Sequence, residues 1–129
     1  MEDVKIKLSA LWAAGMLNGL MGGLLELMES GKLQEIMTGE VGGIQITDEL
    51  LLGMAILMVI PPVMVFLSVT LKDKTNRWAN IIFGIVFIGF GLIEMLEAES
   101  AYMIFVGIVG LVFSALIIGY AYKWPKQEG

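Results

Sequence analysis

Four long apolar runs, separated by short stretches that hold most of the charged residues, dominate the pattern of this chain. They cover residues 8–28, 50–71, 78–96 and 101–122. Each run is close to the ~20 residues that an α-helix needs to cross the ~30 Å hydrocarbon core of a bilayer. The runs do not alternate in polarity, as the strands of a membrane β-barrel do. The pattern therefore predicts four membrane-spanning helices.

The connections between the runs predict how these helices are arranged. Residues 72–77 and 97–100 make short turns, which force successive helices to lie side by side and antiparallel. Residues 30–49 form the one long connection, an outer loop whose first apolar residues have the spacing of a short surface helix. We therefore predict an all-α fold: an antiparallel four-helix transmembrane bundle that forms a single membrane domain over residues 1–129.

Composition excludes several classes of function. Hydrophobic residues make up 57% of the chain and charged residues 16%, whereas soluble domains are near 45–50% and about 25%. The chain has no Cys and no His, which removes disulfides, thiol chemistry and imidazole bases. We therefore predict that the protein is not an enzyme and has no resident cofactor. Its basic clusters are too small for nucleic acid, and whether it binds a metal stays open.

Lys and Arg side chains set the expected orientation, because cytoplasmic loops of membrane proteins are enriched in them. Seven of the eight such residues fall on one side of a four-span path, and Lys32 falls on the other. The seven are Lys5, Lys7, Lys72, Lys74, Arg77, Lys123 and Lys126. We therefore predict a multi-pass protein of the cell membrane, with the lipid bilayer as a partner and both termini in the cytoplasm.

The acidic residues are distributed the other way. Nine of the thirteen lie at or beyond the outer boundary of the spans: Glu26, Glu29, Glu35, Glu40, Asp48, Glu49, Glu94, Glu97 and Glu99. Two interpretations stay open. The acids form a solvated exterior face, as charge runs often do, or they form a vestibule that attracts cations.

The first run carries Gly15, Gly19 and Gly23, which are spaced four residues apart. Such small residues let another backbone approach closely, so the stripe predicts a helix-packing seam, either inside the bundle or between two copies. Glu26 follows Gly15 by eleven residues, which is almost three turns at 3.6 residues per turn. It should therefore share the glycine face and point into protein.

Asn18 and the Pro61–Pro62 pair lie near the midpoints of the first and second runs. Proline has no N–H, so the carbonyls of Leu57 and Met58 lose their helical donors, and we predict a kink in the second helix at Pro61–Pro62. Freed carbonyls in lipid need other donors, and Asn18 at the same depth is the candidate. This link is either structural or part of a binding site.

Glu94 lies in the last turn of the third run and is the most deeply placed acid on the outer side. Either its side chain reaches the hydrated interface, or it is a functional carboxylate within the membrane. Glu26 should lie at a similar depth. The two carboxylates together could bind a cation or share a proton.

Residues 51–81 carry a resemblance to an uncharacterised family of small four-span prokaryotic integral membrane proteins, a domain of unknown function. The matching segments are Leu51 to Met58, Ile60-Pro61, Leu67-Ser68 and Asn76-Arg77-Trp78-Ala79-Asn80-Ile81. The resemblance implies the four-span architecture and no activity. On physical grounds, Asn76 is expected to cap the third helix and Asn80 to bond a neighbouring helix.

Two classes of function remain. In the first, the protein binds or conducts a small solute, with a cation as one candidate, through a homo-oligomer, because four short helices enclose little volume. In the second, it is a non-transporting structural or accessory protein that binds lipid or a partner subunit. The candidate ligand-binding or polar core residues are Asn18, Glu26, Pro61, Pro62 and Glu94, and the expected packing residues are Gly15, Gly19 and Gly23.

Overall fold

Four long helices make up most of the protein. The computed structural model describes residues 3–41 and 43–124. The long helices are α1 (Asp3–Met28), α3 (Asp48–Thr70), α4 (Asp73–Glu97) and α5 (Ala101–Tyr122). Each is long and apolar enough to cross a membrane. The predicted all-α fold is confirmed, and each apolar run falls on one of these helices. Lys126, one of the basic residues used for the orientation, lies outside the described residues.

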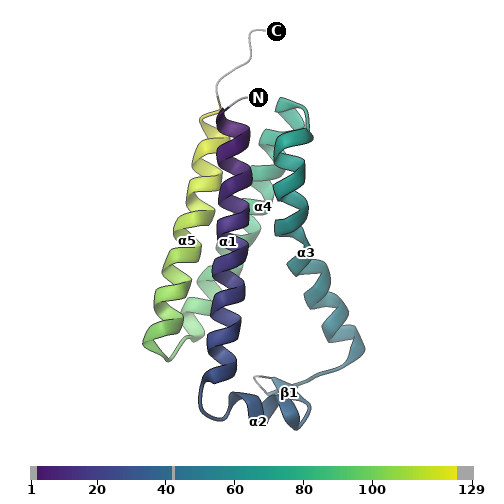
Figure 1. The fold of residues 1–129 in the computed structure, drawn as a ribbon, viewed down its shortest axis with the longest axis vertical. Helices are drawn as coiled ribbons and strands as arrows, with labels where there is room; N and C mark the ends of the chain where they lie inside the picture. The colour runs from purple at the N-terminus through teal and green to yellow at the C-terminus, as the bar shows by residue number, and fades with distance from the viewer. Residues whose placement is uncertain (1–2, 42, 125–129) are drawn as a thin grey trace.

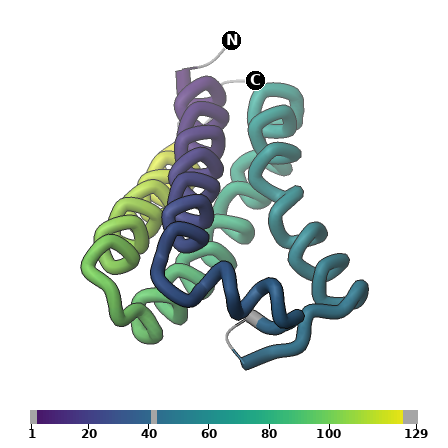
Figure 2. The backbone as a smooth tube through the Cα atoms, turned by 60° about the horizontal axis from the view of Figure 1, so that its bottom comes forward, coloured from purple at the N-terminus to yellow at the C-terminus, as the bar shows by residue number. Residues whose placement is uncertain are grey.

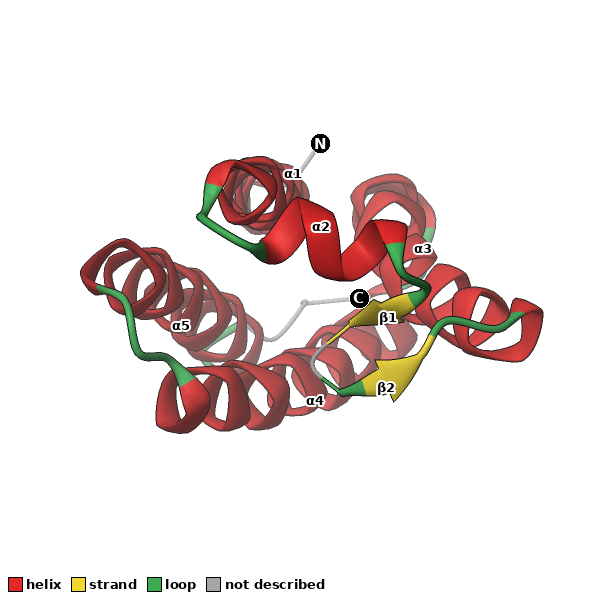
Figure 3. Ribbon diagram, turned by 90° about the horizontal axis from the view of Figure 1, so that it is seen from below, coloured by secondary structure: helices red, strands yellow, loops and turns green. Residues whose placement is uncertain are grey.

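Among residues 3–41 and 43–124, other secondary structure occurs in the connection between α1 and α3. It contains α2 (Lys32–Met37) and two short strands, β1 (Glu40–Val41) and β2 (Ile44–Gln45). The strands pair antiparallel, with Glu40 opposite Gln45 and Val41 opposite Ile44. Figures 2 and 3 show that α2 and the strands lie across one end of the bundle, between α1, α3 and α4.

The helices form a ring in the order α1, α3, α4, α5 (Figure 3). Helix α1 packs along both α3 and α5, and α4 packs along α5, whereas α3 and α4 touch little. Both ends of the chain lie at the same end of the bundle (Figure 1). We call the half near the chain ends the termini half (residues 3–15, 61–84 and 114–124) and the other the hairpin half (residues 16–60 and 85–113).

Helix α3 leaves the bundle partway along its length. Figure 1 shows its hairpin half diverging from the other helices, and Pro61 and Pro62 lie inside the helix. A proline within a helix removes a backbone bond and clashes with the preceding turn, so the predicted kink has a direct cause. Thr47 begins the helix, because its side chain accepts a hydrogen bond of 3.1 Å from the backbone N–H of Leu50.

The core lies in the termini half. The buried apolar side chains of the described residues are Leu8, Trp12, Met64, Ile117, Ala121 and Trp124. Large exposed apolar side chains, in contrast, occur on every long helix. In water such a surface would be strongly unfavourable, whereas in a bilayer the apolar lipid chains cover it.

Candidate functional site

A fully buried polar cluster lies at the centre of the termini half. Ser68 of α3 and Asn76 and Asn80 of α4 each have an exposed fraction of 0%. The Asn80 side-chain amide donates to the Asn76 backbone oxygen at 2.9 Å and to the Asn76 side-chain oxygen at 2.7 Å. The Asn76 amide in turn donates to the Ser68 backbone oxygen at 2.7 Å. The cluster therefore joins α3 to α4 where their turn begins.

Helix α1 enters the same cluster through Trp12. Its indole N–H donates to the side-chain oxygen of Asn80 at 2.7 Å, and the Ser68 hydroxyl reaches the same oxygen at 3.4 Å. The Trp12 ring also meets Phe87 edge-on, with a centroid distance of 5.6 Å. Because Met64 is 1% exposed beside this group, the centre of the termini half is filled.

Two charged contacts close the end of this half that lies near the start of α1 and the end of α5. Arg77 donates from its guanidinium to the backbone oxygens of Ala121 and Tyr122, both at 3.0 Å. These carbonyls lie in the last turn of α5, where the regular i+4 donors of a helix run out, so Arg77 helps to cap that helix. Lys5 of α1 pairs with Asp73 of α4 at 3.2 Å. Between α1 and α3, the Ser9 hydroxyl donates to the Val65 backbone oxygen at 2.8 Å. Polar contacts therefore join α1 to α3, α3 to α4 and α4 to α5 in the termini half.

Three glycines of the hairpin half have open space at their Cβ positions. Gly19 and Gly23 follow the buried Trp12 by seven and eleven residues, and Gly53 precedes the buried Met64 by eleven. Spacings of two or three turns put all three glycines on the core-facing sides of α1 and α3. A Cβ built on any of them would have no neighbouring atom within 4 Å. Uncovered backbone therefore faces the interior here.

Two predicted acids lie at the far end of this open space. Glu94 comes five turns after the buried Asn76, so it shares the core-facing side of α4. Its carboxylate interacts electrostatically with those of Glu26 and Glu97. Glu26 is partly buried and Glu94 is exposed. Glu26 and Glu94 are thus near enough to interact electrostatically, and a shared cation or proton between them stays a prediction.

A third acid at this end is held by the turn between α4 and α5. The Ser100 hydroxyl donates to the Glu29 carboxylate at 2.6 Å. The Tyr102 hydroxyl lies near the same carboxylate and is buried without a hydrogen bond of good geometry. Among residues 3–41 and 43–124, no group of three or more acids lies close enough together to hold a metal ion.

Asn18 does not reach the proline kink. Its side-chain amide donates to the backbone oxygen of Val106 on α5 at 3.2 Å. The predicted link between Asn18 and Pro61–Pro62 is therefore wrong: the two share a depth but lie on helix faces that point to different neighbours. Gly110 of α5 makes room for this contact, since a Cβ there would lie 3.4 Å from the Asn18 amide nitrogen.

The glycine seam is only partly as predicted. Gly15 faces α5, where a Cβ would lie 3.9 Å from the Phe113 Cβ. Among the glycines of α1, Gly22 has the tightest contact with α5, since a Cβ there would come within 2.8 Å of Val106. Gly19 and Gly23 do not pack against any helix within the chain. A seam inside the bundle at those two glycines is therefore wrong, and the alternative of a contact with a second copy stays a prediction.

In the Asn76–Ile81 segment, the expectation for Asn76 is wrong and the one for Asn80 is confirmed. Asn76 does not cap α4, because the helix begins at Asp73 and the Asn76 side chain is buried. The expected bond from Asn80 to a neighbouring helix is confirmed by its contact with Trp12. The burial of Asn76 could have been predicted from the sequence, because Asn76 and Asn80 are two amides one turn apart in an apolar helix. Lipid offers such amides no partner, so they must form hydrogen bonds within the protein.

The sequence comparisons bear on the family alone. The family model described as "Family of unknown function (DUF6326)" matches residues 1–129. Searches of curated proteins and of solved structures gave no match. The geometry of the two halves therefore has to carry any statement about function.

Proposed function

This chain belongs to the family of unknown function DUF6326, and from its geometry we propose an integral membrane protein that binds a small solute in the hairpin half. One observation carries the proposal. Three core-facing glycines, Gly19, Gly23 and Gly53, have no atom within 4 Å of a Cβ position. Glycine lets a ligand approach the backbone closely, so the space beside them suits a small occupant.

The charge at the rim favours a cationic solute. Glu26 and Glu94 interact electrostatically at the open end of this space. Carboxylates beside a low-dielectric wall raise the local concentration of cations. We therefore propose a small organic or inorganic cation as the solute, with Glu26 and Glu94 attracting it and the glycine-lined space receiving it.

The filled termini half favours binding over conduction by one chain. Trp12, Met64, Ser68, Asn76 and Asn80 occupy its centre, so a route across the membrane within one chain would have to break the polar cluster. A homo-oligomer, with any pathway between protomers, is the arrangement that avoids this cost. We propose the cell membrane as the location, with the termini half on the cytoplasmic side because the basic residues gather there.

An accessory role is the second candidate, and a different observation favours it. Residues 51–56 of α3 are exposed on every side of the helix, and only 6% of the most apolar stretch of α3 is buried. A partner subunit or lipid that covers this segment would account for the exposure without any solute.

Equilibrium binding of tetraethylammonium and of sodium to the purified protein in detergent tests the proposal. We expect one cation to bind, and Gly53→Leu, which fills the space, to weaken binding about tenfold, the equivalent of ~1.4 kcal/mol. Glu26→Gln should weaken it less. Gly89→Leu is the matched control, because Gly89 also has no atom within 4 Å but comes two and a half turns after the buried Asn80, on the opposite face of α4.

Equal binding by the Gly53→Leu and Gly89→Leu variants would contradict the proposed site. If the unmodified protein binds neither cation and a subunit co-purifies with it, solute binding is contradicted and the accessory role is supported. The mass of the intact assembly, measured by native mass spectrometry, separately tests the homo-oligomer.

A further inference from the structure

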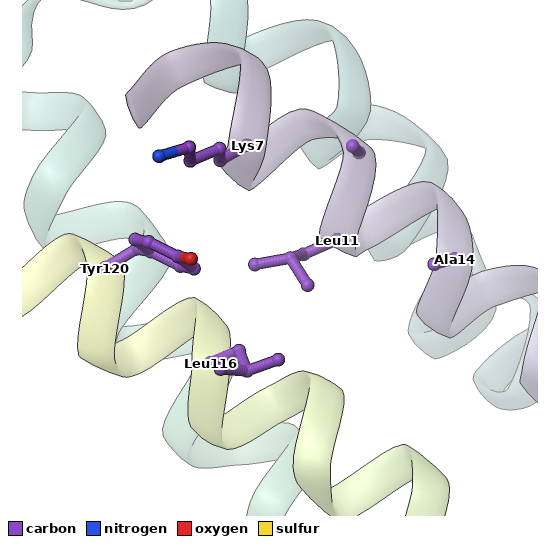
Figure 4. A pocket seen from close by; sticks show the side chains of 6 residues that line it. Lys7, Leu11, Ala14, Leu116 and Tyr120 are labelled. Atoms are coloured by element: carbon purple, nitrogen blue, oxygen red, sulfur yellow. The ribbon is translucent and has the colours of Figure 1, made fainter. Parts of the chain in front are cut away.

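A groove of about 320 Å³ runs between α1 and α5 on the outer surface of the termini half. Figure 4 shows Lys7, Leu11 and Ala14 along α1, facing Leu116 and Tyr120 of α5. Ala10 completes the lining. Because Ala10 and Ala14 carry only a methyl group, they leave the space between the two helices unfilled.

The groove follows the helix axis. Lys7, Leu11 and Ala14 are four and seven residues apart, and Leu116 and Tyr120 are four apart, so each set lies on one face of its helix. At 1.5 Å per residue, Lys7 and Ala14 are about 10 Å apart along α1. Since α1 and α5 run antiparallel, Tyr120 lies beside Lys7 at the termini end and Leu116 lies deeper in the apolar layer.

The groove is polar at one end and apolar along the rest. The Lys7 ammonium nitrogen lies 5.4 Å from the centroid of the Tyr120 ring, a cation–π distance. Two other basic side chains of this region are engaged elsewhere, Lys5 by Asp73 and Arg77 by two carbonyls of α5. The remaining described ones at this end, Lys72, Lys74 and Lys123, do not line the groove. Within the described part of the chain, no carboxylate lies within salt-bridge distance of Lys7.

We propose that this groove binds one phospholipid with a net negative headgroup. The Lys7 ammonium and the Tyr120 hydroxyl contact the headgroup, and one acyl chain lies along Ala10, Leu11, Ala14 and Leu116. Charge complementarity selects this occupant. A single unpaired cation stands at the polar end of an apolar trough, at the level where Lys side chains of membrane proteins reach the headgroups.

This inference goes beyond the proposed solute site and does not depend on it. Ala14 and Gly19 are five residues apart on α1, which places them about 140° apart around the helix at 3.6 residues per turn. The groove therefore faces the surface, while the glycine-lined space faces the interior. Each proposal fails or stands without the other.

Native mass spectrometry of the delipidated full chain, titrated with phosphatidylglycerol or with phosphatidylcholine, tests the groove. We expect one phosphatidylglycerol to bind more tightly than phosphatidylcholine. Lys7→Gln should weaken the binding of phosphatidylglycerol about fivefold, as expected for one Lys at the membrane surface. It should leave the binding of phosphatidylcholine unchanged. Ala14→Leu, which fills the groove without a change of charge, should weaken both lipids.

Lys74→Gln is the matched control, because Lys74 is exposed at the same end of the bundle and does not line the groove. Equal weakening of phosphatidylglycerol by Lys7→Gln and Lys74→Gln would overturn the proposal in favour of general attraction to anionic lipid. Equal affinity of the unmodified protein for the two lipids would overturn it, and so would unchanged binding in Ala14→Leu. Lys7, Ala14 and Lys74 are exposed or only partly buried, so the three variants should fold.

Discussion

The two halves of the bundle are built from the same four apolar helices but are held together differently. In the termini half, Trp12, Ser68, Asn76 and Asn80 bond three helices through buried polar groups. In the hairpin half, the described side-chain bonds between long helices include Asn18 to Val106, and α3 stands apart. Lipid gives apolar helices no hydrophobic reason to associate. The difference therefore shows that placed polar groups and close backbone contacts, and not apolarity, decide where these helices meet.

The largest expected effect comes from removing the centre of the polar cluster. Asn80→Leu leaves the Trp12 indole N–H and the Asn76 side-chain oxygen buried without their partner, so we expect a loss of about 2 to 3 kcal/mol in the free energy of unfolding. Asn18→Leu is the counterpart in the hairpin half. It removes one partly buried bond and should cost about 0.5 kcal/mol.

Reversible unfolding in mixed micelles of mild detergent and dodecyl sulfate measures both values. If the two variants lose the same free energy of unfolding, polar contacts stabilise the two halves equally. The conclusion that the two halves are held together differently would then be wrong.

A second contrast concerns glycines. A Cβ at Gly84 would lie 2.7 Å from Ile118 Cγ1 and 3.5 Å from Ile117 Cγ2, so Gly84→Ala should destabilise the contact of α4 with α5 by about 1 to 2 kcal/mol. Gly19→Ala meets no atom within 4 Å and gains helix propensity, so it should stabilise by roughly 0.5 kcal/mol. The same unfolding assay compares them. A large loss in Gly19→Ala would show that a second copy or a ligand occupies the space in the assay.

A third prediction concerns the shape of α3. The double variant Pro61→Ala, Pro62→Ala restores the backbone bonds to Leu57 and Met58. Residues 48–60 span about 20 Å, and a kink of about 20° displaces the end of such a segment by roughly 7 Å. We expect the distance between spin labels at Leu52 and Leu92 to shorten by about that amount. Because the chain has no Cys, labels can be placed without background.

A label pair at Phe66 and Ile82, in the termini half, is the control and should not move. An unchanged distance between positions 52 and 92 would assign the divergence of α3 to the α2 and strand connection instead of the prolines.

The smallest effect is expected for the ion pair. Lys5 and Asp73 have side chains that are 18% and 32% exposed, and such pairs contribute little because water and salt screen them. A double-mutant cycle with Lys5→Gln and Asp73→Asn should give a coupling of about 0.5 kcal/mol that falls with added salt. A coupling as large as the Asn80 effect would show that charge, and not the buried cluster, holds the termini half.

The sequence predicted the helices well and their rotations poorly. Run length and charge placement determine where an apolar helix crosses a membrane, so the four helices followed directly from the pattern. Which face of each helix meets which neighbour was not determined, because helices apolar on all sides show no stripe that marks the core. Depth alone suggested that Asn18 meets Pro61, and the rotation of α1 instead directs Asn18 to α5.

The same limit explains the polar cluster and the glycines. Asn76 lies three residues into α4, close enough to the start to resemble a cap, and its burial depends on how α3 returns over it. The spacing of Gly15, Gly19 and Gly23 predicted one seam, but among the glycines of α1 it is Gly22 that meets α5 most tightly. The open space beside Gly19 and Gly23 depends on the divergence of α3. The spacing of residues within α1 cannot predict that divergence.

The bond between Trp12 and Asn80 joins residues 68 positions apart in the chain. When α1 is first inserted during synthesis, the acceptor for its indole has not yet been made. The Ser68, Asn76 and Asn80 contacts span twelve residues or fewer, so α3 and α4 can pair as soon as both emerge. The first helix of this protein therefore cannot complete this bond until α4 has been made.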